Sequence, residues 1–202
     1  MGAGVKPGRL LIGLGYQARV GKDSLAHQLV ASHGFTRLAF ADALRDLAPI
    51  VDPPLQSALL ACGGDWELAK AQNPAVRESL QRVGEGAREV FGRDIWIRTL
   101  ASRLGGTGRY VISDVRYLEE AQFIREQGGL LVNICRPGVG AANGHLSEHA
   151  FDGWDGWDAV VHNDSGLERL SWAAAWLVKA FREAGPGETR RPAEFRCASH
   201  WD

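Results

Sequence analysis

The feature that most constrains this chain is a glycine-bounded loop, Gly15 to Lys22, that joins an apolar run to a helical pattern. Leu10 to Leu14 is typical of a buried strand, and Lys22 to Ser32 has apolar residues at helical spacing. A strand, a loop and a helix in this order predict a phosphate loop, because backbone N–H groups and the helix N-terminus can surround a phosphate. Lys22 can reach the β- and γ-phosphates of a nucleotide, and Gly21 allows close backbone approach.

The loop departs from the usual phosphate-loop pattern in two ways. Five residues separate Gly15 from Gly21, where the common pattern has four. Asp23 replaces the hydroxyl residue that usually holds magnesium, but a carboxylate can serve Mg²⁺ directly or through water. Ser24 can offer its hydroxyl to a phosphate. A Gly-rich turn that merely begins a helix is the alternative.

The rest of the chain alternates between strand and helix patterns. Further strands are predicted at Phe35–Phe40, Tyr110–Ser113, Gly129–Cys135 and Ala159–His162. Further helices are predicted at about 42–47, 55–61, 74–91, 94–104, 118–126 and 167–181. The alternation predicts an α/β fold, a three-layer sandwich with a five-stranded parallel sheet. Ligands of such sheets bind beyond the carboxyl ends of the strands, so the residues that follow each strand are the candidates for a site.

Composition excludes several classes of protein. The chain has 202 residues and a formal net charge of −1, which argues against a general binder of nucleic acid. Three widely spaced cysteines form no CxxC pair and argue against a zinc site. No apolar run reaches the ~18 residues that a membrane span needs. We therefore expect a cytoplasmic protein with no membrane or nucleic-acid partner, one domain over 1–183 and a loosely packed tail over 184–202.

Charged residues follow the second, third and fourth predicted strands. Asp114 and Arg116 follow the third strand, where an acid can orient a metal-bound water and an arginine can neutralise a transferred group. Asp42 is predicted to cap a helix, and Arg45 lies three residues further on. Arg136 follows the fourth strand at the same edge. For Asp114 and Arg116, a structural ion pair is the alternative.

Two further patterns are compatible with a nucleotide site. Asn163 lies in a turn after the fifth strand whose amides can recognise a base, although a plain Asx turn explains it equally well. Arg77, Gln81, Gly84 and Arg88 share one stripe of the helix predicted at 74–91. Two guanidiniums, an amide and a gap without a side chain could hold a planar phosphorylated ligand. A solvated helix face is the alternative.

Eight motifs in register resemble those of one enzyme family. They are Gly21-Lys22-Asp23-Ser24, Phe40-Ala41-Asp42, Leu80-Gln81-Arg82-Val83-Gly84, Phe91-Gly92-Arg93-Asp94-Ile95-Trp96, Ser113-Asp114-Val115-Arg116, Arg136-Pro137-Gly138, His145-Leu146-Ser147-Glu148 and His162-Asn163-Asp164. In this order, from about Arg9 to Phe181, they are similar to the phage-type deoxynucleoside monophosphate kinases, which belong to the adenylate-kinase-like group of P-loop kinases. The resemblance implies a P-loop nucleoside monophosphate kinase-like fold and transfer of the γ-phosphoryl of ATP to a (deoxy)nucleoside 5′-monophosphate, with Mg²⁺.

The resemblance also implies where the substrates lie. ATP would contact Gly15, Arg19, Gly21, Lys22, Asp23, Ser24, Arg125 and Asn163, with its base near Asn163. The acceptor would bind a helical region at about 42–104, at Asp42, Arg45, Arg77, Gln81, Arg88, Trp96 and Arg116. Lys22, Asp114, Arg116 and Arg136 would be the catalytic group, with Asp23 and Asp114 on the metal, directly or through water. Small nucleotides are the expected partners, and a homodimer is compatible with the sequence.

Other functions remain open from the sequence. Dephospho-coenzyme A kinase and phosphomevalonate kinase share similar loops, but the Arg77, Gln81 and Arg88 stripe with Trp96 favours a base-plus-phosphate acceptor. A nucleotide-binding regulator without turnover is the alternative from another class, and the presence of Asp114 and Arg116 speaks against it. Closure over the substrates would fall to the helix that carries Arg116 and Arg125, to the acceptor region, or to the loop 136–158. In that loop His145, Glu148 and His149 could ligate a metal, but a Gly-rich loop in a magnesium enzyme argues against zinc.

Overall fold

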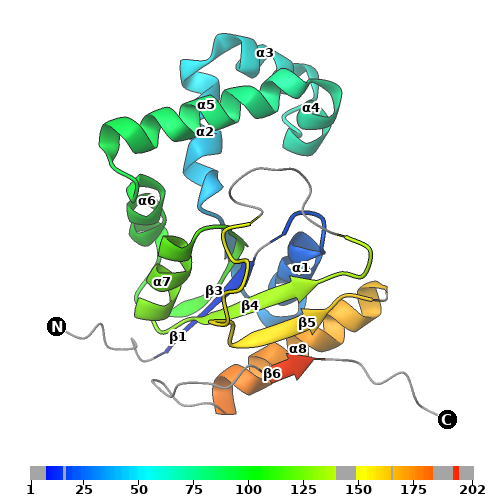
Figure 1. Ribbon diagram of the computed structural model, residues 1–202. Helices are drawn as coiled ribbons and strands as arrows, with labels where there is room; N and C mark the ends of the chain where they lie inside the picture. The colour runs from blue at the N-terminus through cyan, green and yellow to red at the C-terminus, as the bar shows by residue number, and fades with distance from the viewer. Residues whose placement is uncertain (1–7, 16, 140–148, 165, 184–192, 196–202) are drawn as a thin grey trace. The chain divides into compact units, whose positions relative to one another are not determined.

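The computed structural model describes residues 8–15, 17–139, 149–164, 166–183 and 193–195 (Figure 1). The chain forms two compact units. The core unit comprises Met1–Ala39 and Leu104–Asp202, and the helical unit comprises Phe40–Arg103.

The core unit is built on a parallel sheet. Its strands are β1 (Arg9–Gly15), β2 (Thr36–Leu38), β3 (Gly108–Val115), β4 (Leu130–Cys135), β5 (Ala159–His162) and β6 (Ala193–Phe195). They lie in the order β2-β3-β1-β4-β5-β6, and every pair is parallel. The α/β fold class and the five predicted strands are confirmed. The prediction of a loosely packed tail was wrong for β6, whose backbone pairs with β5 and lengthens the sheet by one strand.

Helices cover both faces of this sheet, as the three-layer prediction requires. On one face α1 (Lys22–His33) and α8 (Leu167–Glu183) pack against the alternate residues Ile12 and Leu14 of β1. On the other face α7 (Leu118–Glu126) lies so close to β1 that a Cβ on Gly13 would be 2.5 Å from Cδ1 of Ile124. Gly13 is therefore a close-packing position between helix and strand.

The helical unit contains five helices. They are α2 (Ala41–Val51), α3 (Pro53–Ala61), α4 (Trp66–Gln72), α5 (Pro74–Phe91) and α6 (Ile95–Arg103). Side chains of Asp52, Asp65 and Asn73 accept backbone N–H bonds at the starts of α3, α4 and α5. Prolines at the first positions of α3 and α5 suit a helix start, where the missing N–H costs nothing.

The helical unit differs from its prediction in three places. Helix α4 was not predicted. Helix α2 continues through Pro49 to Val51, beyond the predicted end at about residue 47. Asp42 lies in the first turn of α2 and not at its N-cap, which is Phe40. No helix among the described residues is long and apolar enough to span a membrane.

Candidate active site

The turn that leads from β1 into α1 has the backbone shape of an anion-binding loop. Gly21 is the N-cap of α1, has φ +106°, and places no side chain over the first turn of the helix. Only glycine adopts such a φ without strain. The first amides of a helix have no carbonyl partner within the helix, so this end attracts anions. The geometry therefore suits a phosphate.

The side chain of Lys22 packs against this loop. It is buried, and its ammonium donates a hydrogen bond to the carbonyl oxygen of Gln17 within the same loop. A buried ammonium needs such an acceptor, because charge without a partner is costly away from water. Lys22 is thus held against the loop, where its ammonium can also donate to a phosphate oxygen.

The remaining loop residues differ in exposure. Arg19 is exposed and has φ +63°, an uncommon backbone conformation for a residue with a side chain. Asp23 is exposed in the first turn of α1, and Ser24 is half-buried beside it. Arg19 and Asp23 can therefore reach a ligand in solvent without losing a packing role.

Two side chains from distant parts of the core unit support the loop. A Cβ on Gly15 would lie 2.3 Å from Cη2 of Trp157, so this tryptophan packs directly on the glycine that begins the loop. At the other end, Nδ2 of Asn163 donates to the carbonyl oxygen of Val20 at 2.8 Å. Neither contact was predictable from local sequence patterns, because both join residues more than a hundred positions apart.

The end of β3 carries Asp114 at an irregular place in the sheet. Gly13 pairs with Ile112 but Gly15 pairs with Val115, so β3 has one residue more than β1 across this step. Such bulges re-aim side chains and occur beside active sites. The bulge brings the half-buried Asp114 beside the end of β1, where the phosphate loop begins.

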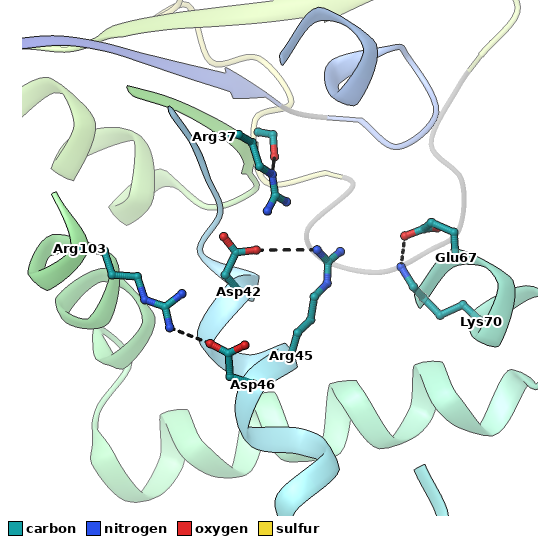
Figure 2. Close-up of polar contacts among 8 residues, drawn as sticks. Arg37, Asp42, Arg45, Asp46, Glu67, Lys70 and Arg103 are labelled. Carbon is teal, nitrogen blue, oxygen red and sulfur yellow. Dashed lines mark hydrogen bonds and ion pairs between the residues drawn. The ribbon is translucent and has the colours of Figure 1, made fainter. Parts of the chain in front are cut away.

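Arg37 of β2 is a basic residue that sequence reasoning missed. Its Nε donates to Oγ of Ser113 at 3.1 Å, and Ser113 is buried next to Asp114 (Figure 2). A single arginine in a three-residue strand gives no periodic signal, so only the pairing of β2 with β3 reveals this position.

Arg116 is exposed, and its backbone is fixed by a buried carboxylate. Oε2 of Glu120 accepts the N–H of Arg116 at 2.8 Å and the N–H of Tyr117 at 3.2 Å. Glu120 is 3% exposed and stands at the third position of α7. This arrangement caps the helix and leaves the Arg116 guanidinium in solvent at the carboxyl edge of the sheet.

Arg125 lies among aromatic residues of the segment 149–158. Its guanidinium stacks over the ring of Trp154 at 5.4 Å, donates to the carbonyl oxygen of Gly156, and lies 4.0 Å from Asp158. These contacts anchor the segment to α7, and they give the Arg125 guanidinium protein partners that do not require a bound phosphate. Arg136 is different, because it is exposed in the turn that follows β4.

Basic residues of the helical unit gather around Glu67. The Lys70 hydrogen bond is the main cause that lowers the pKa of Glu67, and the charges of Arg45 and Arg77 add to it. Arg45 also lies 3.9 Å from Asp42, one turn earlier in α2 (Figure 2). Helices α2, α4 and α5 thus bring Arg45, Lys70 and Arg77 close enough to act on one carboxylate. Glu67 and Lys70 were not predicted as site residues.

The stripe on α5 is only partly available to a ligand. Arg77 and Gln81 are exposed and Arg88 is half-buried. The expected gap at Gly84 is filled, because a Cβ there would lie 3.1 Å from Cδ2 of Leu44 in α2. Trp96 is 7% exposed, which favours packing in the helical unit over stacking on a base.

A family model described as deoxynucleotide monophosphate kinase matches residues 67–173. The chain belongs to this family. The resemblance stated from its motifs is thereby confirmed, and the protein is a phosphotransferase as the other members are.

Two curated relatives carry the family's name. A putative deoxynucleotide monophosphate kinase of Acanthamoeba polyphaga mimivirus is 28% identical over 178 residues, which cover 80% of this chain and 92% of the relative. The deoxynucleotide monophosphate kinase of Escherichia phage RB69 is 26% identical over 102 residues, which cover 48% of this chain and 41% of the relative.

Similar solved structures are more distant. An unliganded sugar kinase from Janibacter sp. HTCC2649 covers 89% of this chain and 99% of its own, with a TM-score of 0.44 and 15% identity. TT1252 from Thermus thermophilus covers 86% of this chain and 97% of its own, with a TM-score of 0.41 and 17% identity. At TM-scores this low, neither likeness bears on function.

The kinase family implies a nucleotide donor, and the residues present suit the magnesium that such a donor carries. Mg²⁺ is usually bound by one or two carboxylates together with phosphate oxygens and waters. Asp23 is exposed at the start of α1, and Asp114 stands at the bulge of β3, so each offers oxygen ligands at the carboxyl edge of the sheet. Within the described residues no three His, Cys, Asp or Glu side chains gather as a closed metal site. His145 and Glu148 lie outside the described residues.

Proposed function

We propose that the protein transfers the γ-phosphoryl group of ATP to a (deoxy)nucleoside 5′-monophosphate, giving ADP and the corresponding diphosphate. The observation that carries the proposal is the phosphate loop with buried Lys22 in a chain of the deoxynucleotide monophosphate kinase family. Phosphoryl transfer needs positioning and positive charge more than covalent chemistry, and this chain supplies both.

The donor triphosphate is proposed to lie over the loop that begins α1. Gly15 and Gly21 let the backbone approach it, Lys22 and Arg19 supply positive charge, and Ser24 supplies a hydroxyl. Asp23 and Asp114 would hold Mg²⁺, directly or through water. When bound, Mg²⁺ neutralises charge on the β- and γ-phosphates.

The transferred group is proposed to be stabilised by arginines from the carboxyl edge of the sheet. Arg116 and Arg136 are both exposed and follow β3 and β4. The capping contact of Glu120 supports this role for Arg116, because a fixed backbone reduces the freedom that the guanidinium must lose. Asp114 would orient the attacking phosphate.

The acceptor is proposed to bind the helical unit through Asp42, Arg45, Arg77, Gln81 and Arg88. The charges of Arg45 and Arg77 both lower the pKa of Glu67, which supports a joint role, because two guanidiniums from different helices act electrostatically on the same region. A nucleoside monophosphate, as an anion, suits such a region. Trp96 is proposed to shape this unit from within.

Two other functions make different predictions. A dephospho-coenzyme A kinase or phosphomevalonate kinase uses another acceptor, and no contact of the described residues favours either. A regulator without turnover needs neither Arg116 nor the carboxylate that caps it, whereas this chain has both.

The test is release of ADP from ATP and Mg²⁺ with a panel of acceptors. The panel holds every common deoxynucleoside and ribonucleoside monophosphate, together with dephospho-coenzyme A and phosphomevalonate. Turnover with one or more nucleoside monophosphates is expected. Turnover with dephospho-coenzyme A or phosphomevalonate alone would replace the proposed acceptor, and tight ATP binding without turnover on any acceptor would favour the regulator.

A further inference from the structure

The side chain of Asn163 is buried where β5 ends. It is 8% exposed, and its Nδ2 donates to the carbonyl oxygen of Val20 at 2.8 Å. The carbonyl of Val20 lies in a loop, where no strand or helix supplies a hydrogen-bond donor. Without Asn163 this carbonyl would be buried with an unsatisfied acceptor, which is costly. The amide of Asn163 is the group that satisfies it.

The same side chain packs against the next residue of the loop. A Cβ on Gly21 would lie 2.4 Å from Nδ2 and 3.4 Å from Cγ of Asn163. Gly21 thus leaves room for Asn163 as well as supplying the left-handed backbone. The hydrogen bond and the close contact hold two consecutive residues immediately before Lys22.

Asn163 is itself held by the sheet. Its backbone N–H donates to the carbonyl oxygen of Cys135 at 2.7 Å, which continues the pairing of β5 with β4. A side chain anchored in this way has little conformational freedom, so its amide donor restricts where the loop carbonyl of Val20 can lie.

We propose that Asn163 is a positioning residue that holds the phosphate loop in its binding shape through Val20 and Gly21. It acts on the donor phosphates by fixing the backbone amides of the loop, and not by contact with the base. This inference rests on the proposed function for its effect on ATP, but its effect on the loop is a property of the protein alone.

The first experiment measures the loop in the absence of any nucleotide. Asn163→Leu keeps the side chain's size and neutrality and removes the donor, and Asn163→Ala serves if the leucine variant does not fold. Hydrogen exchange followed by NMR should show the amide of Leu25, whose N–H donates to the carbonyl oxygen of Gly21 at 3.0 Å, exchanging about tenfold faster in the variant. Val178→Ala, a buried substitution in α8, is the control for a general loss of stability. A Leu25 amide that exchanges at the wild-type rate, or no faster than in this control, would overturn the inference.

The second experiment separates the phosphates from the base. Inorganic tripolyphosphate and ATP, each with Mg²⁺, are titrated into the wild type, Asn163→Leu and Val178→Ala. Both ligands should bind about tenfold more weakly to Asn163→Leu, with KM for ATP raised and KM for the acceptor unchanged. Weaker binding of ATP with unchanged binding of tripolyphosphate would instead place the base on Asn163 and overturn the inference. If the wild type bound neither ligand, the proposed function would fail, and the exchange experiment would still decide whether Asn163 holds the loop.

Discussion

Gly15→Ala tests how the phosphate loop is supported at its first residue. The added Cβ would lie 2.3 Å from Cη2 and 2.8 Å from Cζ3 of Trp157. Trp157 is 6% exposed and packs on Phe151 at 4.8 Å and on Trp154 at 5.0 Å between ring centroids, so it has little room to move. Gly15 is not among the residues with positive φ, so the backbone accepts alanine. The next atom that the Cβ would meet is the carbonyl oxygen of Val115 at 3.4 Å, so most of the cost falls on Trp157.

Overpacking of this kind costs about 1–3 kcal/mol of folding free energy. A loss of about 2 kcal/mol lowers the Tm of a chain of this size by about 4–8 °C. The assay is urea denaturation followed by circular dichroism, in the wild type and in a Trp157→Leu background. The shorter side chain leaves space for the methyl group, so the cost of Gly15→Ala should nearly vanish there, with a coupling of about 1–3 kcal/mol.

Gly106→Ala is the matched control. Gly106 has no atom within 4 Å of an added Cβ and no positive φ, so this substitution should change stability by less than about 0.5 kcal/mol. The reasoning is refuted if Gly15→Ala costs the same with Trp157 and with Leu at that position, or if it costs no more than Gly106→Ala.

Three further predictions concern single side chains. Arg116→Ala should lower kcat by about 10³ and leave the KM for the acceptor nearly unchanged, because the arginine acts on the transferred group; a change in acceptor KM alone would make it a binding residue. Glu120→Gln should lower the free energy of unfolding by about 1–2 kcal/mol in urea denaturation. The glutamine oxygen can still accept the N–H groups of Arg116 and Tyr117, but these hydrogen bonds are weaker without the negative charge of the carboxylate. The control Glu119→Gln, at an exposed position, should leave stability unchanged. Hydrogen bonds from Ser79 and the Leu55 amide, with the charge of Arg82, lower the pKa of Asp52. The wild type should therefore lose stability as the pH falls through that lowered pKa. In an acid titration of stability, Asp52→Asn should lose less over the same pH range.

The sequence predicted the elements whose signal is local. The bounds of α5, Pro74–Phe91, agree with the prediction because proline opens the helix, glycine follows its end and the apolar spacing fills the interval. The strands β1, β4 and β5 follow in the same way from short apolar runs. Helix α4 has seven residues and β6 has three, which is too short for a periodic pattern to stand out.

The site was harder to predict, because its contacts join distant parts of the chain. Gly13 stands in the predicted first strand and Gly15 at the start of the predicted phosphate loop, but no local pattern indicates that Ile124 and Trp157 are the side chains that require these glycines. A lone tryptophan does not reveal whether it stacks on a ligand or packs in a core, and Trp96 is buried. Val90 illustrates the same limit, since it fits the apolar stripe of α5 and yet is 73% exposed.

Charged residues show a further limit. The family resemblance implied that Arg125 contacts ATP, but its guanidinium contacts Trp154 and Gly156, in a segment that no local pattern connects to α7. Arg37 and Lys70 were not predicted as site residues, because each lies in a short element that carries no recognisable motif.

The most direct test of the account follows the phosphoryl group itself. ATP labelled at its γ-phosphate is mixed with Mg²⁺, each deoxynucleoside monophosphate in turn, and either the wild type or Lys22→Ala. With the wild type, the label should appear at the β-position of a deoxynucleoside diphosphate, whereas Lys22→Ala should fold normally and transfer none. Label found only in inorganic phosphate, or equal transfer by Lys22→Ala, would contradict it.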